Sequence, residues 1–251
     1  MKMQGKTVIV TGAGRGIGYG IATAFAKEGA NIVVTDLNAE NLQDIVKNLS
    51  ALGVDVLPVV ADGADEVAVE TCIKKTVDRF GRIDVVVNNA QTSNPGIMLA
   101  DYTTADLDLA VHTGLYATFY YMRAAFPYLK ETHGTVINLA SGAGLFGRFG
   151  QSSYAATKEG IRGLSRVAAA EWGEFGINVN VICPLVKTPA LEQWRQEYPE
   201  LYESSIKRIP LKRFGDAETD IGRVCVFLAS DDASFISGES ITVQGGSGLR
   251  P

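Results

Sequence analysis

The sequence predicts an α/β protein in one domain, built on a doubly wound parallel sheet. Short runs rich in valine and isoleucine alternate along the chain with longer segments of helical period. The short runs show little alternation between polar and apolar residues, as expected for strands that are buried on both faces. Because repeated strand–helix units connect through right-handed crossovers, we expect parallel strands with helices covering both faces of the sheet.

The expected elements follow one another with short connections. The strands are expected at Thr7–Val10, Asn31–Thr35, Val54–Val60, Ile83–Val87, Thr135–Leu139, Asn178–Ile182 and Ser240–Val243. The helices are expected at Gly16–Lys27, Ala39–Leu52, Asp65–Phe80, Thr104–Lys130, Ser152–Glu174 and Glu218–Ala229. Residues 187–215 contain three prolines and break the alternation. We interpret them as a lid segment inserted into a single domain that spans residues 1–251.

Composition excludes several classes of protein. With 46% hydrophobic and 20% charged residues, the chain of 251 residues can bury a sizeable core. A net charge of −5 argues against a nucleic-acid or anionic-membrane partner. The chain begins without the apolar core of a signal peptide and contains no run long enough to span a bilayer, so we expect a cytoplasmic protein. Three scattered cysteines and two histidines lack the spacing of a metal site.

A glycine-rich turn, Thr11-Gly-Ala-Gly-Arg-Gly-Ile-Gly18, joins the first strand to the first helix. Such a turn brings backbone N–H groups to a pyrophosphate at the positive end of a helix, although a tight turn alone also requires glycine. Asp36 follows at the end of the second strand, where a carboxylate accepts hydrogen bonds from an adenosine ribose. It would repel a 2′-phosphate, and Leu37 supplies no cation, so NAD is favoured over NADP. Arg15 counts against this preference, because a cation in the loop could hold that phosphate.

Tyr154 and Lys158 lie four residues apart in Tyr-Ala-Ala-Thr-Lys, after Ser141. Positions i and i+4 share one face of a helix, so the phenol and the ammonium can reach the same small volume. At ~4 Å and an effective dielectric of about 20, the lysine charge would favour the phenolate by roughly 4 kcal/mol. We therefore expect it to lower the pKa of Tyr154 from about 10 toward the working range of a general base. By itself the spacing is also that of an ordinary solvated helix face.

Four motifs in this order carry a family resemblance. They are the glycine turn Thr11–Gly18, Asn88-Asn89-Ala90, Ser141 and Tyr154-x-x-x-Lys158. With these motifs the chain resembles the short-chain dehydrogenase/reductases from end to end. The resemblance implies a Rossmann-type fold, a nicotinamide cofactor and a homotetramer. It also implies that Tyr154 is the acid/base, that Lys158 lowers its pKa and holds the nicotinamide ribose, and that Ser141 positions the substrate oxygen.

The resemblance extends the cofactor site beyond the glycine turn. Asp62 matches an adenine-contacting aspartate, Asn88 and Ala90 match backbone contacts beside the ribose, and Val186 and Thr188 match residues that hold the carboxamide. The expected cofactor-binding residues are therefore Gly12, Arg15, Gly16, Ile17, Gly18, Asp36, Leu37, Asp62, Gly63, Asn88, Ala90, Tyr154, Lys158, Val186 and Thr188.

The sequence departs from the family pattern at three positions. Gly114 stands where the family has an asparagine whose helix bend holds a water in the proton relay. Three explanations stay open there: main-chain groups and water suffice, another side chain substitutes, or the chemistry is impaired. Gln91 replaces a usual glycine and places an amide near the nicotinamide end, either as a substrate contact or as a polar loop residue. Leu185 follows Pro184 where the family has glycine.

These departures resemble those of bacterial 12α-hydroxysteroid dehydrogenases that transform bile acids. The shared segments are Asn88–Gln91, Gly114–Phe119, Ser141–Phe146, Tyr154–Val167, Glu171–Gly173, Cys183–Leu185 and the end of the chain from Gly245-Gly246 to Arg250-Pro251. The glycine turn and Asp36 differ from an NADP-using member, in the direction of NAD. This resemblance implies a substrate class but does not fix which carbon carries the hydroxyl.

Apolar residues of the lid segment could line a flat substrate. Leu191, Trp194, Tyr198, Leu201 and Tyr202 recur at roughly helical spacing, and Leu145, Phe146 and Phe149 follow the serine. The expected substrate-binding residues are Gln91, Ser141, Leu145, Phe146, Tyr154, Leu191, Trp194 and Tyr198. Packing on the sheet or on a neighbouring subunit would explain the same stripe. Lys187, Lys207, Arg208, Lys212 or Arg213 could meet an acidic substrate group or lie on a solvated surface.

The function predicted from the sequence is reversible, NAD-dependent oxidation of a secondary alcohol to a ketone, on a hydroxysteroid or bile acid. One alternative keeps the chemistry but takes another steroid position, a polyol or a 3-oxoacyl substrate. A second alternative, motivated by Gly114, is a cofactor-binding sensor or scaffold with weak or no turnover. The intact Ser141, Tyr154 and Lys158 argue against this second alternative.

Overall fold

The computed structural model describes residues 1–248 and contains a sheet of seven strands in the order β3-β2-β1-β4-β5-β6-β7. All neighbouring strands run parallel. The strands are β1 (Thr7–Thr11), β2 (Asn31–Asp36), β3 (Val56–Val60), β4 (Val85–Asn88), β5 (Thr135–Leu139), β6 (Asn178–Pro184) and β7 (Ser240–Val243). The predicted doubly wound sheet is confirmed, with strand ends shifted by one or two residues. Arg250 and Pro251, which contributed to the narrower resemblance, lie outside the described residues.

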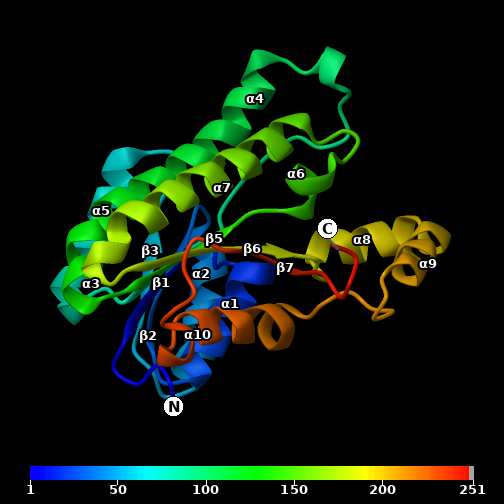
Figure 1. Ribbon diagram of the computed structural model, residues 1–251. Coiled ribbons are helices and arrows are strands. Elements are labelled where there is room, and N and C mark those ends of the chain that lie inside the picture. The colour runs from blue at the N-terminus through cyan, green and yellow to red at the C-terminus, as the bar shows by residue number, and fades with distance from the viewer. Residues whose placement is uncertain (249–251) are drawn as a thin grey trace.

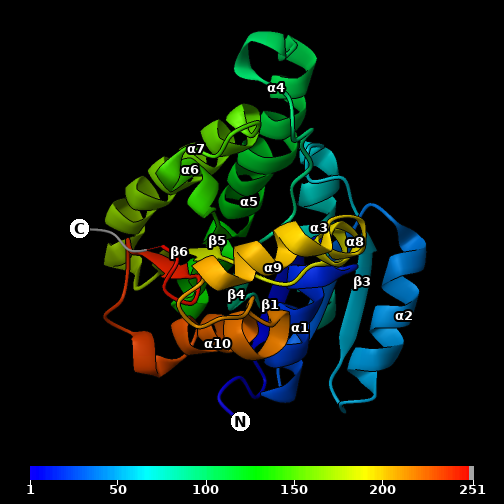
Figure 2. The same ribbon diagram turned by 90° about the vertical axis from the view of Figure 1, so that its right-hand side faces the viewer.

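Helices cover both faces of this sheet (Figures 1 and 2). One face carries α1 (Gly16–Lys27), α2 (Ala39–Ser50) and α10 (Arg223–Leu228), and the other carries α3 (Glu66–Phe80), α5 (Ala117–Thr132) and α7 (Ser152–Trp172). Consecutive strand residues face opposite layers: Val8 packs in the first core and Ile9 in the second. Both faces are apolar, which explains why the strand sequences lack a two-residue alternation.

Two of the predicted helices are wrong as continuous elements. The segment expected as Thr104–Lys130 divides into α4 (Thr104–Ala110), a π-helical turn η2 (Val111–Tyr116) and α5. The segment expected as Glu218–Ala229 likewise divides into a π-helical turn η4 (Ala217–Gly222) and α10. Apolar periodicity cannot distinguish a π-turn from the helix around it, because one extra residue in a turn leaves most of the pattern intact.

Smaller differences arise at helix ends and connections. Asp65 is the N-cap of α3 and not its first residue, since its carboxylate accepts from the N–H of Val67 at 2.9 Å. The helix expected to end at Glu174 ends instead at Trp172 and continues as the 3₁₀ turn η3 (Gly173–Phe175). The short helix α6 (Gly142–Phe146) was not predicted. Further short 3₁₀ turns are η1 (Leu99–Asp101) and η5 (Asp231–Ala233).

The lid segment, residues 187–215, holds the helices α8 (Pro189–Glu197) and α9 (Pro199–Arg208), which follow the carboxyl end of β6 (Figure 1). A parallel β-bridge between Val186 and Gly215 joins its two ends. In that bridge the N–H of Lys187 donates to the carbonyl of Gly215 at 2.9 Å. Each helix begins with a proline at its first turn, where the missing N–H costs nothing.

The strand order reverses between β1 and β4, because β2 pairs with β1 on one side of this point and β5 pairs with β4 on the other. In open α/β sheets the crevice at such a switch point, outside the carboxyl ends of the strands, is where ligands bind. The turns after β1 and β4 therefore define where a site is to be sought.

Candidate active site

The turn after β1 depends on glycine at three positions. Gly12 and Gly16 adopt φ values of +60° and +58°, a left-handed conformation that favours glycine. A Cβ on Gly18 would lie 2.4 Å from the carbonyl oxygen of Gly12, so only glycine lets α1 begin this close to the turn. The N-terminal end of α1 therefore lies directly behind the turn, as an anion-binding βα turn requires.

Thr11 and Asn89 join this turn to the end of β4. The backbone N–H groups of Asn89 and Ala90 both donate to the Thr11 hydroxyl at 3.0 Å. The Asn89 side chain donates to the carbonyls of Thr11 and Gly12 at 2.9 and 3.1 Å. Asn89 and Thr11 were not among the predicted site residues. Thr11 lies in the glycine turn Thr11–Gly18 and Asn89 in Asn88-Asn89-Ala90, and these positions were the available indication of their role in the site.

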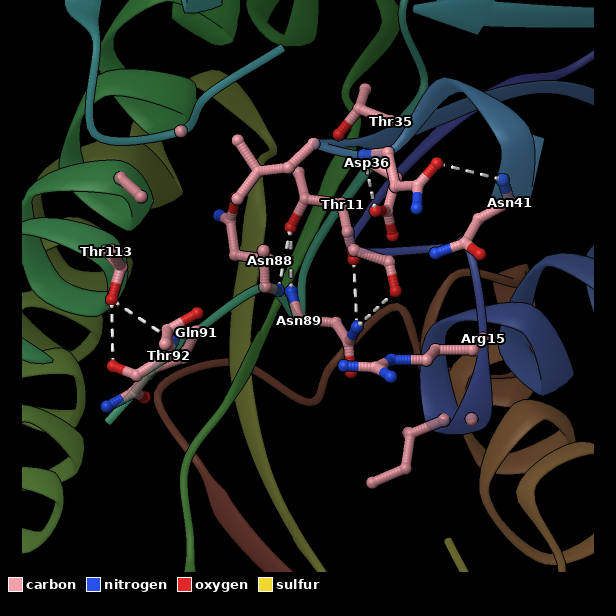
Figure 3. A pocket seen from close by; sticks show the side chains of 18 of the residues that line it. Thr11, Arg15, Thr35, Asp36, Asn41, Asn88, Asn89, Gln91, Thr92 and Thr113 are labelled. Carbon is pink, nitrogen blue, oxygen red and sulfur yellow. Dashed lines mark hydrogen bonds between the residues drawn. The ribbon is translucent and has the colours of Figure 1, made fainter. Parts of the chain in front are cut away.

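Asp36 lies against the glycine turn from the end of β2. Its carboxylate accepts from the N–H of Gly14 and of Asn38, each at 3.0 Å. A Cβ on Gly14 would approach Asp36 Oδ2 to 2.3 Å, so a side chain there would displace the carboxylate from the turn. Leu37 is 62% exposed beside it. Figure 3 shows Asp36 and Asn41 on one side of the turn and Arg15 on the other.

The two turns enclose a cavity of about 690 Å³. The predicted cofactor residues on its wall are Gly12, Arg15, Gly16, Ile17, Asp36, Leu37, Asp62, Gly63, Asn88, Ala90 and Thr188, together with Gln91 from the predicted substrate set. Lining residues that were not predicted include Thr11, Thr35, Asn38, Asn41, Asn89, Thr113, Thr118, Tyr121 and Gln193. Gly18 and Val186 lie outside the wall: Gly18 packs behind the turn, and Val186 is buried at the base of the lid segment.

The cavity has the features that a dinucleotide requires. Its wall carries the glycine turn for the pyrophosphate and a carboxylate for a ribose. The side-chain oxygen of Asn88 is buried there without a hydrogen-bond partner in residues 1–248, while its amide donates to Asn138 at 2.8 Å. A buried acceptor of this kind is expected to find a donor on a ligand or a water.

Ser141, Tyr154 and Lys158 come from the end of β5 and from α7, outside the wall of this cavity. Ser141 is the N-cap of α6, and its hydroxyl accepts from the N–H of Ala143 at 3.1 Å. Lys158 is buried and donates from Nζ to the carbonyl of Leu139 at 2.7 Å. Leu139 ends β5 one residue after Asn138, so the lysine lies next to the Asn88–Asn138 pair.

Burial dominates the electrostatics of the pair Tyr154 and Lys158. Loss of hydration raises the pKa of Tyr154 above its usual value, and a hydrogen bond with Ser141 partly opposes the rise. The same loss of hydration lowers the pKa of Lys158 from 10.5 to about 7. The lysine ammonium lies over the tyrosine ring, 5.5 Å from its centroid. The expected lowering of the Tyr154 pKa is therefore wrong for this structure, because desolvation of the phenolate outweighs the opposing effects, which come from Ser141 and Arg148 and not from Lys158.

The predicted substrate residues differ in burial, and only some of them are exposed to a ligand. Leu145 packs against Ala140, Val181 and Cys183, whereas Phe146 is 52% exposed. In the lid segment, Trp194 lies beside Tyr198 and Tyr202, with ring centroids 6.4 and 6.3 Å away, and Leu191 is half-buried. Tyr202 is buried, so part of the predicted apolar stripe packs within the lid segment instead of facing a ligand.

Comparisons with known proteins agree with this geometry. A family model described as enoyl-(acyl carrier protein) reductase matches residues 12–248. A 12α-hydroxysteroid dehydrogenase of a Clostridium species is 56% identical over 255 residues, covering 99% of this chain and 98% of that protein. A 3-oxoacyl-[acyl-carrier-protein] reductase of Thermotoga maritima is 34% identical, covering 98% of this chain and 99% of that protein.

Two solved structures share the fold over nearly the whole chain. Levodione reductase superimposes with a TM-score of 0.92 at 34% identity, covering 98% of each chain. An NAD⁺-bound xylitol dehydrogenase superimposes with a TM-score of 0.92 at 30% identity, covering 98% of this chain and 100% of that one.

The Rossmann-type sheet and the cleft at its switch point define an NAD(P)-dependent oxidoreductase. The chain belongs to the short-chain dehydrogenase/reductase family. Within residues 1–248 there is no helix long and apolar enough to cross a membrane.

The depressed pKa of Lys158 predicts a pH-dependent contribution to stability. Between pH 7 and 10.5 the unfolded chain binds more protons at this side chain than the folded protein does, so folding becomes more favourable as pH rises. We expect the melting temperature of the wild type, relative to Lys158→Met, to rise by about 3–5 °C per pH unit across this window and to stay level below pH 7. Differential scanning calorimetry measures it.

The exposed Lys75 supplies the control, since Lys75→Met should show no such slope. If the difference in melting temperature between wild type and Lys158→Met stays constant from pH 7 to 10, the folded protein does not depress the pKa of Lys158.

Proposed function

We propose that the protein is an NAD-dependent dehydrogenase that interconverts a secondary alcohol and a ketone on a hydroxysteroid, with the 12α-hydroxyl of a bile acid as its substrate. The observation that carries this proposal is the set Ser141, Tyr154 and Lys158 at the end of β5 and on α7, in a chain 56% identical to a 12α-hydroxysteroid dehydrogenase.

The proposed cofactor site divides between the two turns. Gly12, Gly16 and the start of α1 would hold the pyrophosphate, and Asp36 would accept hydrogen bonds from the adenosine ribose. A bound oxidised nicotinamide would supply the hydride acceptor and a positive charge beside the phenol. Lys158, next to the end of β5, would reach the second ribose.

The chain's own residues would handle the substrate proton. Ser141 and Tyr154 would hold the alcohol oxygen between two hydroxyls, and Tyr154 as phenolate would accept its proton. Because burial raises the pKa of Tyr154, the phenolate requires nearby positive charge, which the ammonium of Lys158 supplies when protonated. Burial of Lys158 would strengthen that attraction, since charges interact more strongly in a low dielectric.

Exposed apolar side chains support an apolar substrate. Phe146 after the serine and Tyr198 and Leu201 in the lid segment are each at least half exposed. Two of the lid cations are already paired, since Lys187 binds Glu192 at 2.8 Å and Arg213 binds Asp220. Lys207 and Arg208 remain exposed in the last turn of α9, where an acidic substrate side chain could meet them.

The preference for NAD would rest on the carboxylate of Asp36. It is held against the glycine turn by two backbone N–H groups and faces the cavity beside Leu37 and Asn38. A 2′-phosphate there would meet a fixed negative charge, and such like-charge contacts cost several kcal/mol. Arg15 also lines the cavity, and its positive charge favours NADP.

A homotetramer, also proposed, would use the apolar groove between α5 and α7. The groove measures about 260 Å³ and is lined by Phe119, Met122, Arg123, Phe126, Leu164, Val167, Ala168, Glu171 and Trp172. Val167 is 54% exposed and Phe119 is 37% exposed at its rim. Apolar side chains gathered along two adjacent helices in this way favour pairing with a second copy.

Replacing Tyr154 by phenylalanine should remove the base while keeping the ring. We expect kcat for oxidation of a 12α-hydroxylated bile acid to fall by about 10³-fold, because a positioned acid/base contributes 10²–10⁴-fold. NADH formation is followed at 340 nm on a panel of hydroxylated bile acids, polyols and simple alcohols, with 3-oxoacyl thioester reduction assayed in reverse. Activity retained by Tyr154→Phe would overturn the mechanism, and turnover of non-steroids alone would overturn the substrate.

Neutralising Asp36 should change the cofactor preference. Asp36→Asn keeps the shape and one acceptor but removes the charge, so we expect the kcat/KM ratio of NADP to NAD to rise about 100-fold. The exposed Asp44→Asn on α2 is the matched control. A wild type that already prefers NADP, or a ratio unchanged by Asp36→Asn, would contradict this role.

A charge in the α5/α7 groove should disrupt the proposed assembly. Val167→Arg would place a large charged side chain at the subunit contact, so we expect particles of about four times 26.8 kDa to dissociate to dimers or monomers. Light scattering after size exclusion measures the mass. Val67→Arg, on the exposed part of α3, is the control. A wild type of 26.8 kDa in solution would refute the tetramer.

A further inference from the structure

Gly114 and Gln91 share one space beside α7. Gly114 is buried in the π-helical turn η2, where a Cβ would lie 2.6 Å from the Thr157 methyl carbon and 2.9 Å from Cδ of Gln91. It would also lie 3.0 Å from Gln91 Oε1. The side-chain amide of Gln91 therefore occupies the place that a side chain at residue 114 would take. Thr157, the third member of this contact, immediately precedes Lys158 in the chain.

A second set of contacts holds the loop of Gln91 in this position. The N–H of Thr92 donates to the Thr113 hydroxyl at 3.1 Å. That hydroxyl shares its own proton between the carbonyls of Thr92 at 2.9 Å and Leu109 at 2.7 Å. Figure 3 shows Gln91 beside this pair, with Thr92 and Thr113 joined by dashed lines. Thr113, the residue before Gly114, thus fastens the loop after β4 to the π-helical turn. Gln91 precedes Thr92 in that loop, and its side chain is directed toward Gly114.

Both amide atoms of Gln91 are buried and lack hydrogen-bond partners within residues 1–248. The hydroxyl of Thr157 is in the same condition. Buried polar groups in native proteins nearly always have partners, and an amide can offer two donors and two acceptor sites. The Gln91 amide and the Thr157 hydroxyl are therefore unsatisfied polar groups on two residues that adjoin Gly114, and such groups are expected to find partners in ordered water.

Lys158 requires a polar group or a water nearby if its ammonium is to exchange protons with solvent. The residue is 4% exposed and its ammonium uses one donor on the carbonyl of Leu139, so the side chain is largely shielded from solvent. Burial also lowers its pKa to about 7, so it exchanges protons near neutral pH. Gln91 adjoins Gly114, which packs against Thr157, the residue before Lys158, and Gln91 also lines the cavity.

We propose that Gln91 is a positioning residue of the proton path: its amide, seated against Gly114, holds a water through which the ammonium of Lys158 exchanges its proton with solvent. The proton lost by the substrate alcohol passes to Tyr154, and Lys158 and this water carry the charge outward. The inference rests on the proposed dehydrogenase function. It also explains why residue 114 is glycine, because any larger side chain would displace the amide.

The test replaces Gln91 by leucine, which has a similar volume and no polar atoms. In steady-state oxidation of the alcohol, kcat should fall about 10–100-fold while KM changes less than about threefold, because the proton path is affected and substrate binding is not. Small buffers such as imidazole should restore kcat in a concentration-dependent manner, which a purely structural defect would not show. Gln91→Glu, which keeps a polar group, should retain most of the activity.

The exposed Gln43→Leu on α2 is the matched control and should match the wild type. A kcat for Gln91→Leu within twofold of wild type, without a buffer effect, would refute the proposal. A raised KM with unchanged kcat would also refute it and would make Gln91 a substrate contact.

A stability cycle tests the shared space without turnover. In a Thr157→Ser background, which removes the methyl contact, Gly114→Asn should lower the melting temperature by about 5 °C, because the new side chain meets the amide of Gln91. Adding Gln91→Gly should recover at least half of that loss, and additive effects would refute the seating of Gln91. If the wild type oxidises none of the alcohols, the proposed function fails while this cycle still decides the geometry.

Discussion

The site depends on one constraint, the close contact between the turn after β1 and the end of β4. Thr11 and Asn89 hold these segments together through hydrogen bonds of 2.9–3.1 Å between side chain and backbone. Because the two strands lie at the switch point of the sheet, this contact decides where the cavity opens. Glycine is required near this contact by lack of space as well as by the backbone dihedral angles. A Cβ on Gly18, for example, would lie 2.4 Å from the carbonyl oxygen of Gly12.

Beyond this contact the polar groups form a continuous series into the interior. Asn88 donates to Asn138, whose own amide donates to the Ser165 hydroxyl at 2.8 Å. Lys158 then binds the carbonyl next to Asn138. Such buried polar networks are costly unless satisfied, and here they fix the end of β5 and the face of α7 relative to each other. The catalytic candidates are thereby positioned by the same sheet edge that shapes the cavity.

Desolvation is the main electrostatic effect at this position. It raises the pKa of the Tyr154 phenol and lowers that of the Lys158 ammonium, so both groups favour their neutral forms in the folded protein. A chemically active phenolate then requires positive charge brought close to it. In the proposed dehydrogenase this charge would come from the Lys158 ammonium and from a bound oxidised nicotinamide, which would link acid/base chemistry to cofactor binding.

The sheet, the family and the composition of the glycine turn could be predicted from the amino-acid sequence, because apolar strand segments and glycine-rich turns are local features of the chain. The helix between residues 104 and 130 could not be predicted in detail, since a π-turn leaves apolar periodicity almost unchanged. The electrostatic expectation for Tyr154 also failed, because spacing reveals proximity but not desolvation. Only the tertiary structure placed the amide of Gln91 in the space left by Gly114, since those residues come from separate elements that meet through packing.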